Sequence, residues 1–225
     1  MSRHEQAVID RFNLFMKAQA GTRRQRYGYI ALDGQDRHVL ADYILTNEST
    51  FTLVEFKYTQ SERRDEGRKH RSLTLCSHLE RDNEMRALHD LCHFVAWMQV
   101  PDYRPHLNIY RHEICNCEVF GLECGLKSKA PSSTTRVDAR EFARSFFDEP
   151  SARTLSIDEF DIYVEWLFGR LDGSGASTLE LLVGDDDSAN CDFIAFPSVR
   201  SLYEWFQDRR PTMNQTPTPS SGPDW

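Results

Sequence analysis

An acid and a lysine alternate in one apolar run of the chain, and a second acid lies in the run before it. In Glu55-Phe56-Lys57, side chains alternate across a strand, so Glu55 and Lys57 project from the same face. Asp42 lies in the preceding strand-like run. Two carboxylates beside an amine can hold a divalent cation and activate a water molecule, so this trio predicts metal-assisted hydrolysis.

The spacing between the two runs sets Asp42 against Glu55. A four-residue hairpin loop after Thr46 pairs that residue with Phe51, and counting back along both strands places Asp42 opposite Glu55. Two carboxylates that close repel unless a cation separates them, and Mg²⁺ or Mn²⁺ suits such oxygen ligands. The alternative is a cross-strand ion pair of Lys57 with either acid, without a catalytic role.

The elements expected around this trio follow the order α-β-β-β-α-β. Apolar residues at helical spacing predict the helices, and short turn signals between the first three strands predict antiparallel hairpins. The expected ranges are 4–19 for the first helix, 27–32, 38–45 and 51–59 for three strands, 72–98 for the second helix and 106–114 for a fourth strand.

With this element order, the chain resembles the PD-(D/E)xK nuclease superfamily, which has the restriction-endonuclease-like fold. The resemblance covers about residues 4–120 and rests on Asp42, the 12-residue gap and Glu55-Phe56-Lys57; it departs from the family pattern at Ala41, where proline is common. It implies an α+β fold with a mixed central sheet. It also implies that Asp42 and Glu55 hold Mg²⁺ or Mn²⁺ while Lys57 serves the water and the scissile phosphate.

Four further residues are candidates for the same site. A glutamate on the first helix often joins the site in this family, and Glu5 lies on the apolar stripe of that helix. Its alternative role is to complete a capping box with Ser2. Arg64, Arg68 and Arg71 would share one face of a helix and could contact nucleic-acid phosphates. Their alternative is a solvated helix of mixed charge.

Histidine and cysteine offer a rival chemistry. The set His112, Cys115, Cys117 and Cys124 could supply four ligands to a structural zinc, although its spacing does not match paired C-x-x-C motifs. The chain has six cysteines. Because its first residues contain no apolar export signal, we expect reduced thiols and a cytoplasmic protein.

Composition sets the class and the boundaries. The 225 residues are 40% hydrophobic, which is ample for a core, and no apolar run reaches the roughly 20 residues of a membrane span. We expect a nuclease-like core at 1–126, a linker at 127–137, an α/β extension of helices and a hairpin at 138–210, and a disordered tail rich in Pro, Ser and Thr at 211–225.

Three functions follow from these observations. The first is a Mg²⁺- or Mn²⁺-dependent endonuclease that acts on DNA rather than RNA; association with the family suggests phage or mobile-element defence. The second is a catalytically inactive subunit of the same fold that acts in binding or assembly. The net charge of −8 opposes unaided DNA binding, so we expect a protein partner or a homo-oligomer. The third is a zinc-stabilised interaction protein.

Overall fold

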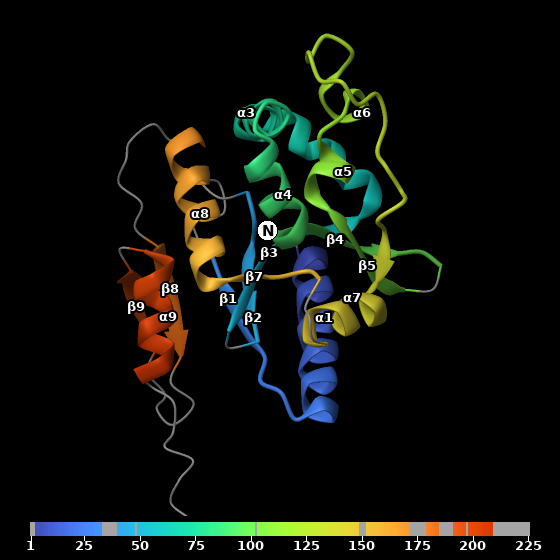
Figure 1. Cartoon of the computed structure of the whole chain (residues 1–225). Helices are drawn as coiled ribbons and strands as arrows, with labels where there is room; N and C mark the ends of the chain where they lie inside the picture. The colour runs from blue at the N-terminus through green and yellow to red at the C-terminus, as the bar shows by residue number, and fades with distance from the viewer. Residues whose placement is uncertain are drawn as a thin grey trace, which may run out of the picture.

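The centre of the fold is one sheet of seven strands. The computed structural model describes residues 3–32, 40–47, 49–101, 103–148, 152–171, 179–184, 191–196 and 198–208; the expected tail at 211–225 and the start of the expected strand at 38 lie outside these ranges. The strand order is β1-β2-β3-β4-β5-β6, with β7 pairing with β3 (Figure 1). The strands are β1 Gly28–Ala31, β2 Tyr43–Thr46, β3 Thr50–Thr59, β4 His93–Gln99, β5 Arg104–Ile109, β6 Val137–Asp138 and β7 Leu155–Ser156.

The sheet is mixed because one connection is a crossover. β1, β2 and β3 form an antiparallel meander, whereas β4 pairs parallel to β3. A parallel neighbour needs a long connection. Here it consists of the 3₁₀ helix η1 (Gln60–Arg68) and the helices α3 (His70–Leu79) and α4 (Asn83–Cys92). The expected α+β class is confirmed, with α-β-β-β-α-β as the order of its first half.

Helices cover both faces of this sheet (Figure 1). On one face, α1 (Arg3–Arg23) and α7 (Ala139–Phe147) pack over even-numbered residues of β3 such as Val54 and Phe56. On the other face, α3, α4 and α8 (Ile157–Leu171) pack over odd-numbered residues such as Leu53. Because side chains alternate along a strand, Glu55 and Lys57 belong to the second face, opposite α1.

The prediction that the second helix continues to residue 98 is wrong. The chain leaves α4 at Cys92 and enters β4 at once, and five of the seven β4 residues are fully buried. A strand buried on both faces reads as a continuous apolar run, which spacing alone does not separate from a helix. The expected strand 106–114 is also divided, into β5 and the helix α5 (Tyr110–Ile114). A second short helix, α6 (Cys117–Phe120), follows.

Elements after residue 136 complete the same sheet and its two layers. β6 pairs with β5, and β7 pairs with the start of β3. A capping box opens α8, since the Ser156 N–H donates to the Glu159 carboxylate at 3.1 Å and the Glu159 N–H donates to the Ser156 hydroxyl at 3.4 Å. A separate hairpin of β8 (Leu179–Gly184) and β9 (Cys191–Phe196) lies with α9 (Val199–Asp208) beside α8.

Gly67 is the point of closest approach between η1 and α6. A Cβ atom there would lie 2.2 Å from the backbone oxygen of Val119, so one of the two elements would have to move. We expect Gly67→Ala to lower the free energy of unfolding by about 2 kcal/mol. Urea denaturation measures the change. The matched control is Gly169→Ala in α8, where a Cβ meets nothing within 4 Å, and which should gain about 0.5–1 kcal/mol.

Candidate active site

A β-bulge places the Asp42 carboxylate beside β3. The predicted register is present, with Thr46 opposite Phe51 and Tyr43 opposite Val54. One residue further, the Asp42 N–H donates to the Val54 oxygen at 3.0 Å, so two residues of one strand face a single residue of the other. The Asp42 side chain then accepts the Phe56 N–H at Oδ2, at 2.6 Å. The carboxylate therefore replaces a backbone acceptor where the β2–β3 pairing ends.

Glu55 lies buried between two ammonium groups. Its side chain is 3% exposed, and its Oε1 accepts from Lys57 Nζ at 2.5 Å and from Lys69 Nζ at 2.9 Å. Lys57 is itself 9% exposed, whereas Lys69, which follows η1, is 40% exposed. The cluster is thus closed toward the sheet and open to solvent on the side of Lys69.

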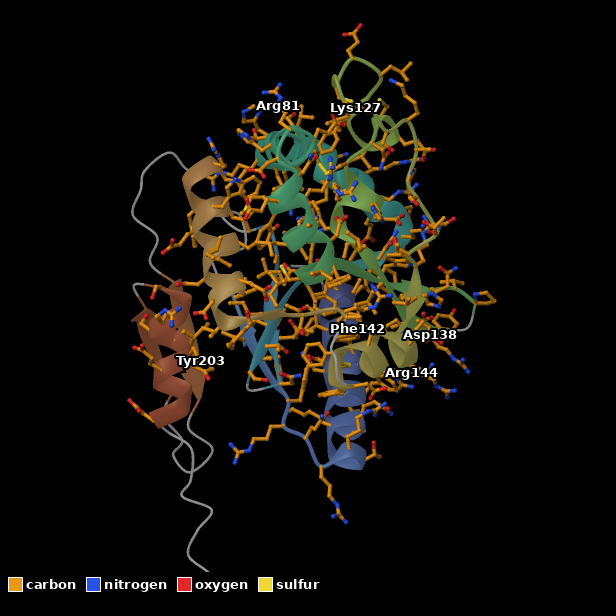
Figure 2. All side chains as sticks on the ribbon, in the orientation of Figure 1. Arg81, Lys127, Asp138, Phe142, Arg144 and Tyr203 are labelled. Atoms are coloured by element: carbon orange, nitrogen blue, oxygen red, sulfur yellow. A yellow bond between two sulfur atoms is a disulfide. The ribbon has the colours of Figure 1, made fainter. Side chains whose placement is uncertain are left out.

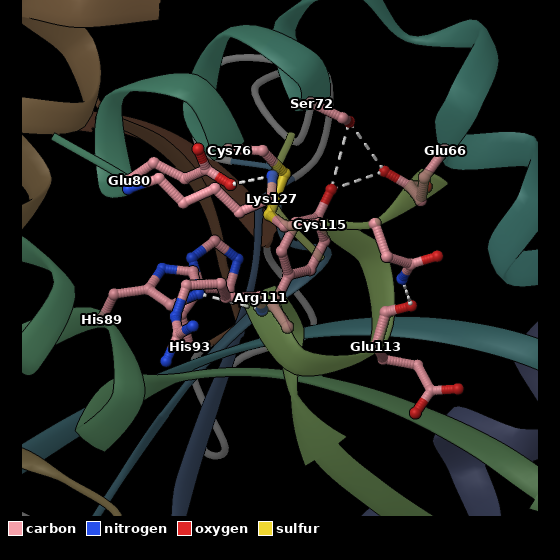
Figure 3. Close-up of a disulfide and its surroundings, with 12 residues drawn as sticks. Glu66, Ser72, Cys76, Glu80, His89, His93, Arg111, Glu113, Cys115 and Lys127 are labelled. Carbon is pink, nitrogen blue, oxygen red and sulfur yellow. Dashed lines mark hydrogen bonds between the residues drawn. A yellow bond between two sulfur atoms is a disulfide. The ribbon is translucent and has the colours of Figure 1, made fainter. Parts of the chain in front are cut away.

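A third carboxylate, Glu66 of η1, completes the cluster. Its Oε1 lies 2.9 Å from Lys57 Nζ and 2.7 Å from Lys69 Nζ. Its Oε2 accepts from the Ser72 hydroxyl at 3.0 Å and from the Tyr110 hydroxyl at 2.8 Å. Figure 3 shows Ser72 and Glu66 pointing toward each other beside the disulfide. Sequence reasoning missed Glu66 and Lys69 as members of the site.

The cluster contains three carboxyl groups and two ammonium groups. Asp42, Glu55 and Glu66 share the charges of the two lysines. Burial and then the Glu55 charge raise the pKa of Asp42 well above its usual value, and burial raises the pKa of Glu55. Burial alone would raise the pKa of Glu66 too, but the lysines lower it to about 2. Without a cation, Asp42 and Glu55 therefore hold a proton more readily than ordinary carboxyl groups, so positive charge is lacking on their side of the cluster.

The pKa of Lys57 shifts in the corresponding direction. Burial would lower it, but the charges of Glu55 and Glu66 outweigh burial and raise it. Lys57 is therefore a fixed positive charge at neutral pH and does not act as a free base. In this position it can neutralise charge on a neighbouring anion and orient a water molecule through its N–H groups.

Two carboxylate oxygens face no donor. Within the described residues, Asp42 Oδ1 and Glu55 Oε2 accept no hydrogen bond, whereas the other oxygen of each group is engaged. Across those same residues, no group of three or more His, Cys, Asp and Glu side chains is placed to hold a metal ion. Mg²⁺ commonly uses one or two protein carboxylates and completes its shell with water and substrate phosphates. The two open oxygens fit that pattern.

A relay of neutral histidines supports the approach to Asp42. Leu40 has a φ of +54°, a region unfavourable for a branched side chain, and its carbonyl accepts His93 Nε2–H at 2.9 Å. His93 Nδ1 then accepts the Tyr163 hydroxyl at 2.9 Å, and the Tyr163 oxygen accepts His89 Nδ1–H at 2.6 Å. His89 Nε2 accepts the Arg111 N–H at 3.1 Å. Each donor meets one acceptor only when both rings are neutral.

Stability should therefore fall in mild acid. Burial lowers the pKa of His93 to about 4, and it also lowers the pKa of His89. A histidine whose pKa is depressed by folding contributes stability above its unfolded pKa of about 6.5, and that stability is lost as the pH falls toward 4. From pH 7 to pH 5 we expect His93 alone to cost about 2 kcal/mol. Urea denaturation at the two pH values measures this.

The control is His93→Gln. The quantity compared with the wild type is the difference in its free energy of unfolding between pH 7 and pH 5. This variant lacks one titrating group, so its loss should be smaller than that of the wild type by about 2 kcal/mol. An equal loss in both proteins would contradict the neutral relay.

The remaining site candidates lie apart from the cluster. Glu5 is half-buried on α1. The ring of the neighbouring His4 is tilted against the Tyr58 ring, with 4.8 Å between centroids, on the other face of the sheet from Glu55. Arg64 and Arg68 are exposed, and Arg68 lies 3.4 Å from Asp65. Arg64, Arg68 and Arg71 do not share one continuous helix, since η1 ends at Arg68 and α3 begins at His70. The roles of these four residues stay predictions.

The expected zinc ligands are not assembled. The Cys115 sulfur is bonded to Cys76, a disulfide that corrects the expectation of reduced thiols and joins the end of α5 to α3 (Figure 3). The His112 ring is engaged at both nitrogens, at 2.7 Å by the Thr135 hydroxyl and at 2.8 Å by the Arg111 guanidinium. Within the described ranges, this leaves the Cys117 and Cys124 sulfurs, 3.5 Å apart, without further metal ligands from that set.

Comparisons with protein-family models, with curated proteins and with solved structures find no match to the chain. Among the helices that the structure describes, none combines the length and the apolar character that crossing a membrane requires. The geometry and charge of the site are therefore what indicate a function.

Proposed function

We propose that the protein is a metal-dependent phosphodiesterase, a nuclease that cleaves DNA in the presence of Mg²⁺ or Mn²⁺. The observation that carries the proposal is the pair of donor-free oxygens on Asp42 and Glu55, in a cluster where three carboxyl groups share two ammonium groups. The resemblance to the PD-(D/E)xK superfamily supports the same conclusion and suggests a role in phage or mobile-element defence.

Each residue of the cluster has a distinct task in this proposal. Asp42 and Glu55 would hold the cation, which when bound polarises the scissile phosphate and its attacking water. Lys57 stabilises the negative charge that develops on the phosphate, and its position beside Glu55 is fixed by Glu66. Ser72 and Tyr110 orient Glu66 by donating two hydrogen bonds to its Oε2. Lys69, the most exposed member, lies where an anionic substrate would enter.

A second function has one observation in its favour. Lys57 and Lys69 already contact both buried glutamates, so the cluster is held together without a metal. The same arrangement suits a catalytically inactive subunit of this fold, in which the charges only fix η1 against the sheet. Metal binding and cleavage separate the two functions.

Cleavage should depend on the metal and on Glu55. We expect the purified protein to cut supercoiled or single-stranded DNA with Mn²⁺ or Mg²⁺ and not with EDTA. Glu55→Gln keeps the size of the side chain but removes a ligand charge, so it should reduce cleavage by roughly 100-fold or more. Glu165→Gln, on the exposed side of α8, is the matched control and should cleave like the wild type. Gel analysis of the products measures both.

Metal binding gives a readout that does not require cleavage. A saturating Mn²⁺ concentration should raise the melting temperature of the wild type and of Glu165→Gln, because a ligand that binds only the folded state stabilises it. Glu55→Gln should lose this increase. A wild-type protein that neither gains stability with Mn²⁺ nor cleaves DNA would favour the inactive subunit instead.

Asp42 offers a test of the crowded carboxylates. Because its pKa is raised, the ionised form destabilises the metal-free fold at neutral pH, so Asp42→Asn in EDTA should be as stable as the wild type or more stable. Asn also retains an oxygen for the Phe56 N–H. Asp42→Ala lacks that oxygen and should lose about 1–3 kcal/mol. If Asp42 served as an ion-pair partner of Lys57, Asp42→Asn would instead destabilise the fold in the thermal melt.

A further inference from the structure

Three arginines from distant parts of the chain line one pocket. α1 contributes Arg11, the start of β5 contributes Arg104, and the first turn of α7 contributes Arg140. The pocket has a volume of about 180 Å³, and Phe15 forms part of its apolar wall. Asp138 also lines it, at the beginning of α7 (Figure 2). Arginines gather here although the whole chain carries a net charge of −8.

The guanidinium groups of the pocket outnumber its carboxylates by three to one. All three arginines are exposed, and among the described residues none of their side chains forms an ion pair or a hydrogen bond. Asp138 keeps its negative charge, but its Oδ1 is directed to the Glu141 N–H at 2.8 Å as the N-cap of α7. An excess of positive charge attracts an anion, and guanidinium groups match phosphate oxygens in a bidentate geometry.

An aromatic ring stands at the same pocket in an unfavourable backbone conformation. Tyr103 is 65% exposed, and its φ of +50° lies in the left-handed region that bulky residues rarely adopt. The turn between β4 and β5 therefore holds an apolar ring toward solvent at an energetic cost, and such local strain occurs preferentially at functional sites. Exposed aromatic rings beside cations are the surfaces on which nucleic-acid bases stack.

We propose that this pocket binds single-stranded nucleic acid, with one phosphate held by Arg11, Arg104 and Arg140 and the adjoining base stacked on Tyr103. The inference rests on the proposed nuclease function in one respect, because it specifies that the nucleic acid bound by the nuclease is single-stranded. The pocket itself is separate from the carboxylate cluster and needs no metal.

The sheet lies between the pocket and the cluster. Arg11 and Arg140 come from α1 and α7, which cover the face of the sheet opposite Lys57. Binding at the pocket is therefore independent of the carboxylate cluster.

Binding is measured by fluorescence anisotropy with a labelled single strand of about 12 nucleotides, in EDTA so that no cleavage occurs. Arg11→Gln, Arg104→Gln and Arg140→Gln should each raise Kd by about 5- to 10-fold and reduce the salt dependence of log K by about 0.7. Tyr103→Leu should raise Kd by about 10-fold, whereas Tyr103→Phe, which retains a ring for stacking, should bind like the wild type.

The matched control is Arg144→Gln, which removes the same charge from the same helix outside the pocket (Figure 2). An equal loss in Arg144→Gln and Arg140→Gln would overturn the pocket in favour of general electrostatic attraction. Unchanged binding in all three arginine variants would also overturn it. A mononucleotide could also displace the labelled strand at the same molar concentration as the unlabelled strand does. That result would assign the pocket to a free nucleotide and contradict a strand site.

The two proposals fail in different ways. A wild type that binds the strand in EDTA but never cleaves it with Mn²⁺ refutes only the nuclease function. Cleavage by the wild type, together with normal binding by the pocket variants, refutes only the pocket. Melting temperatures of the exposed arginine variants should match the wild type, which confirms that the binding losses do not come from unfolding.

Discussion

Burying Glu55 and Glu66 is the constraint on which this end of the molecule depends. An unpaired carboxylate in a protein interior costs several kcal/mol, so each glutamate requires a cation and further donors. Lys57, on β3 beside Glu55, contacts both glutamates, and Lys69 contacts both from the end of η1. The end of η1 sets this contact, because Lys69 follows the helix in an extended conformation and donates its backbone N–H to the Glu66 carbonyl oxygen at 3.0 Å.

The same requirement organises the elements around the cluster. Glu66 still has an oxygen to satisfy after it meets the lysines, and Ser72 of α3 and Tyr110 of α5 supply the donors. The crossover between β3 and β4 is therefore fixed by polar contacts on its inner side. Gly67 lets η1 approach α6 closely, while Leu40, held by His93, directs the chain into the bulge at Asp42. The site is assembled by backbone geometry as much as by its charged groups.

The parts that could be predicted from sequence are those with local geometry. The hairpin register follows from a short loop, so the pairing that brings Asp42 toward Glu55 could be counted, although the bulge at Asp42 could not. Glu66 and Lys69 carry no such signal. They lie in and directly after a 3₁₀ helix whose sequence has no apolar periodicity, so nothing in the spacing indicates that they contact β3. β4 was missed because both of its faces are buried. The disulfide joins cysteines 39 residues apart, and no local pattern links them.

The disulfide has a consequence for the precision of the site. Cys76 lies one turn after Ser72 on α3, and Cys115 directly follows α5, which begins at Tyr110. The covalent link therefore keeps the two hydroxyl donors of Glu66 at a high effective concentration around its Oε2, and less conformational entropy is lost when both bind. Glu66 is therefore restricted to fewer positions, and its Oε1 lies 2.9 Å from Lys57 Nζ. The disulfide thus also restricts the positions of the Lys57 ammonium group.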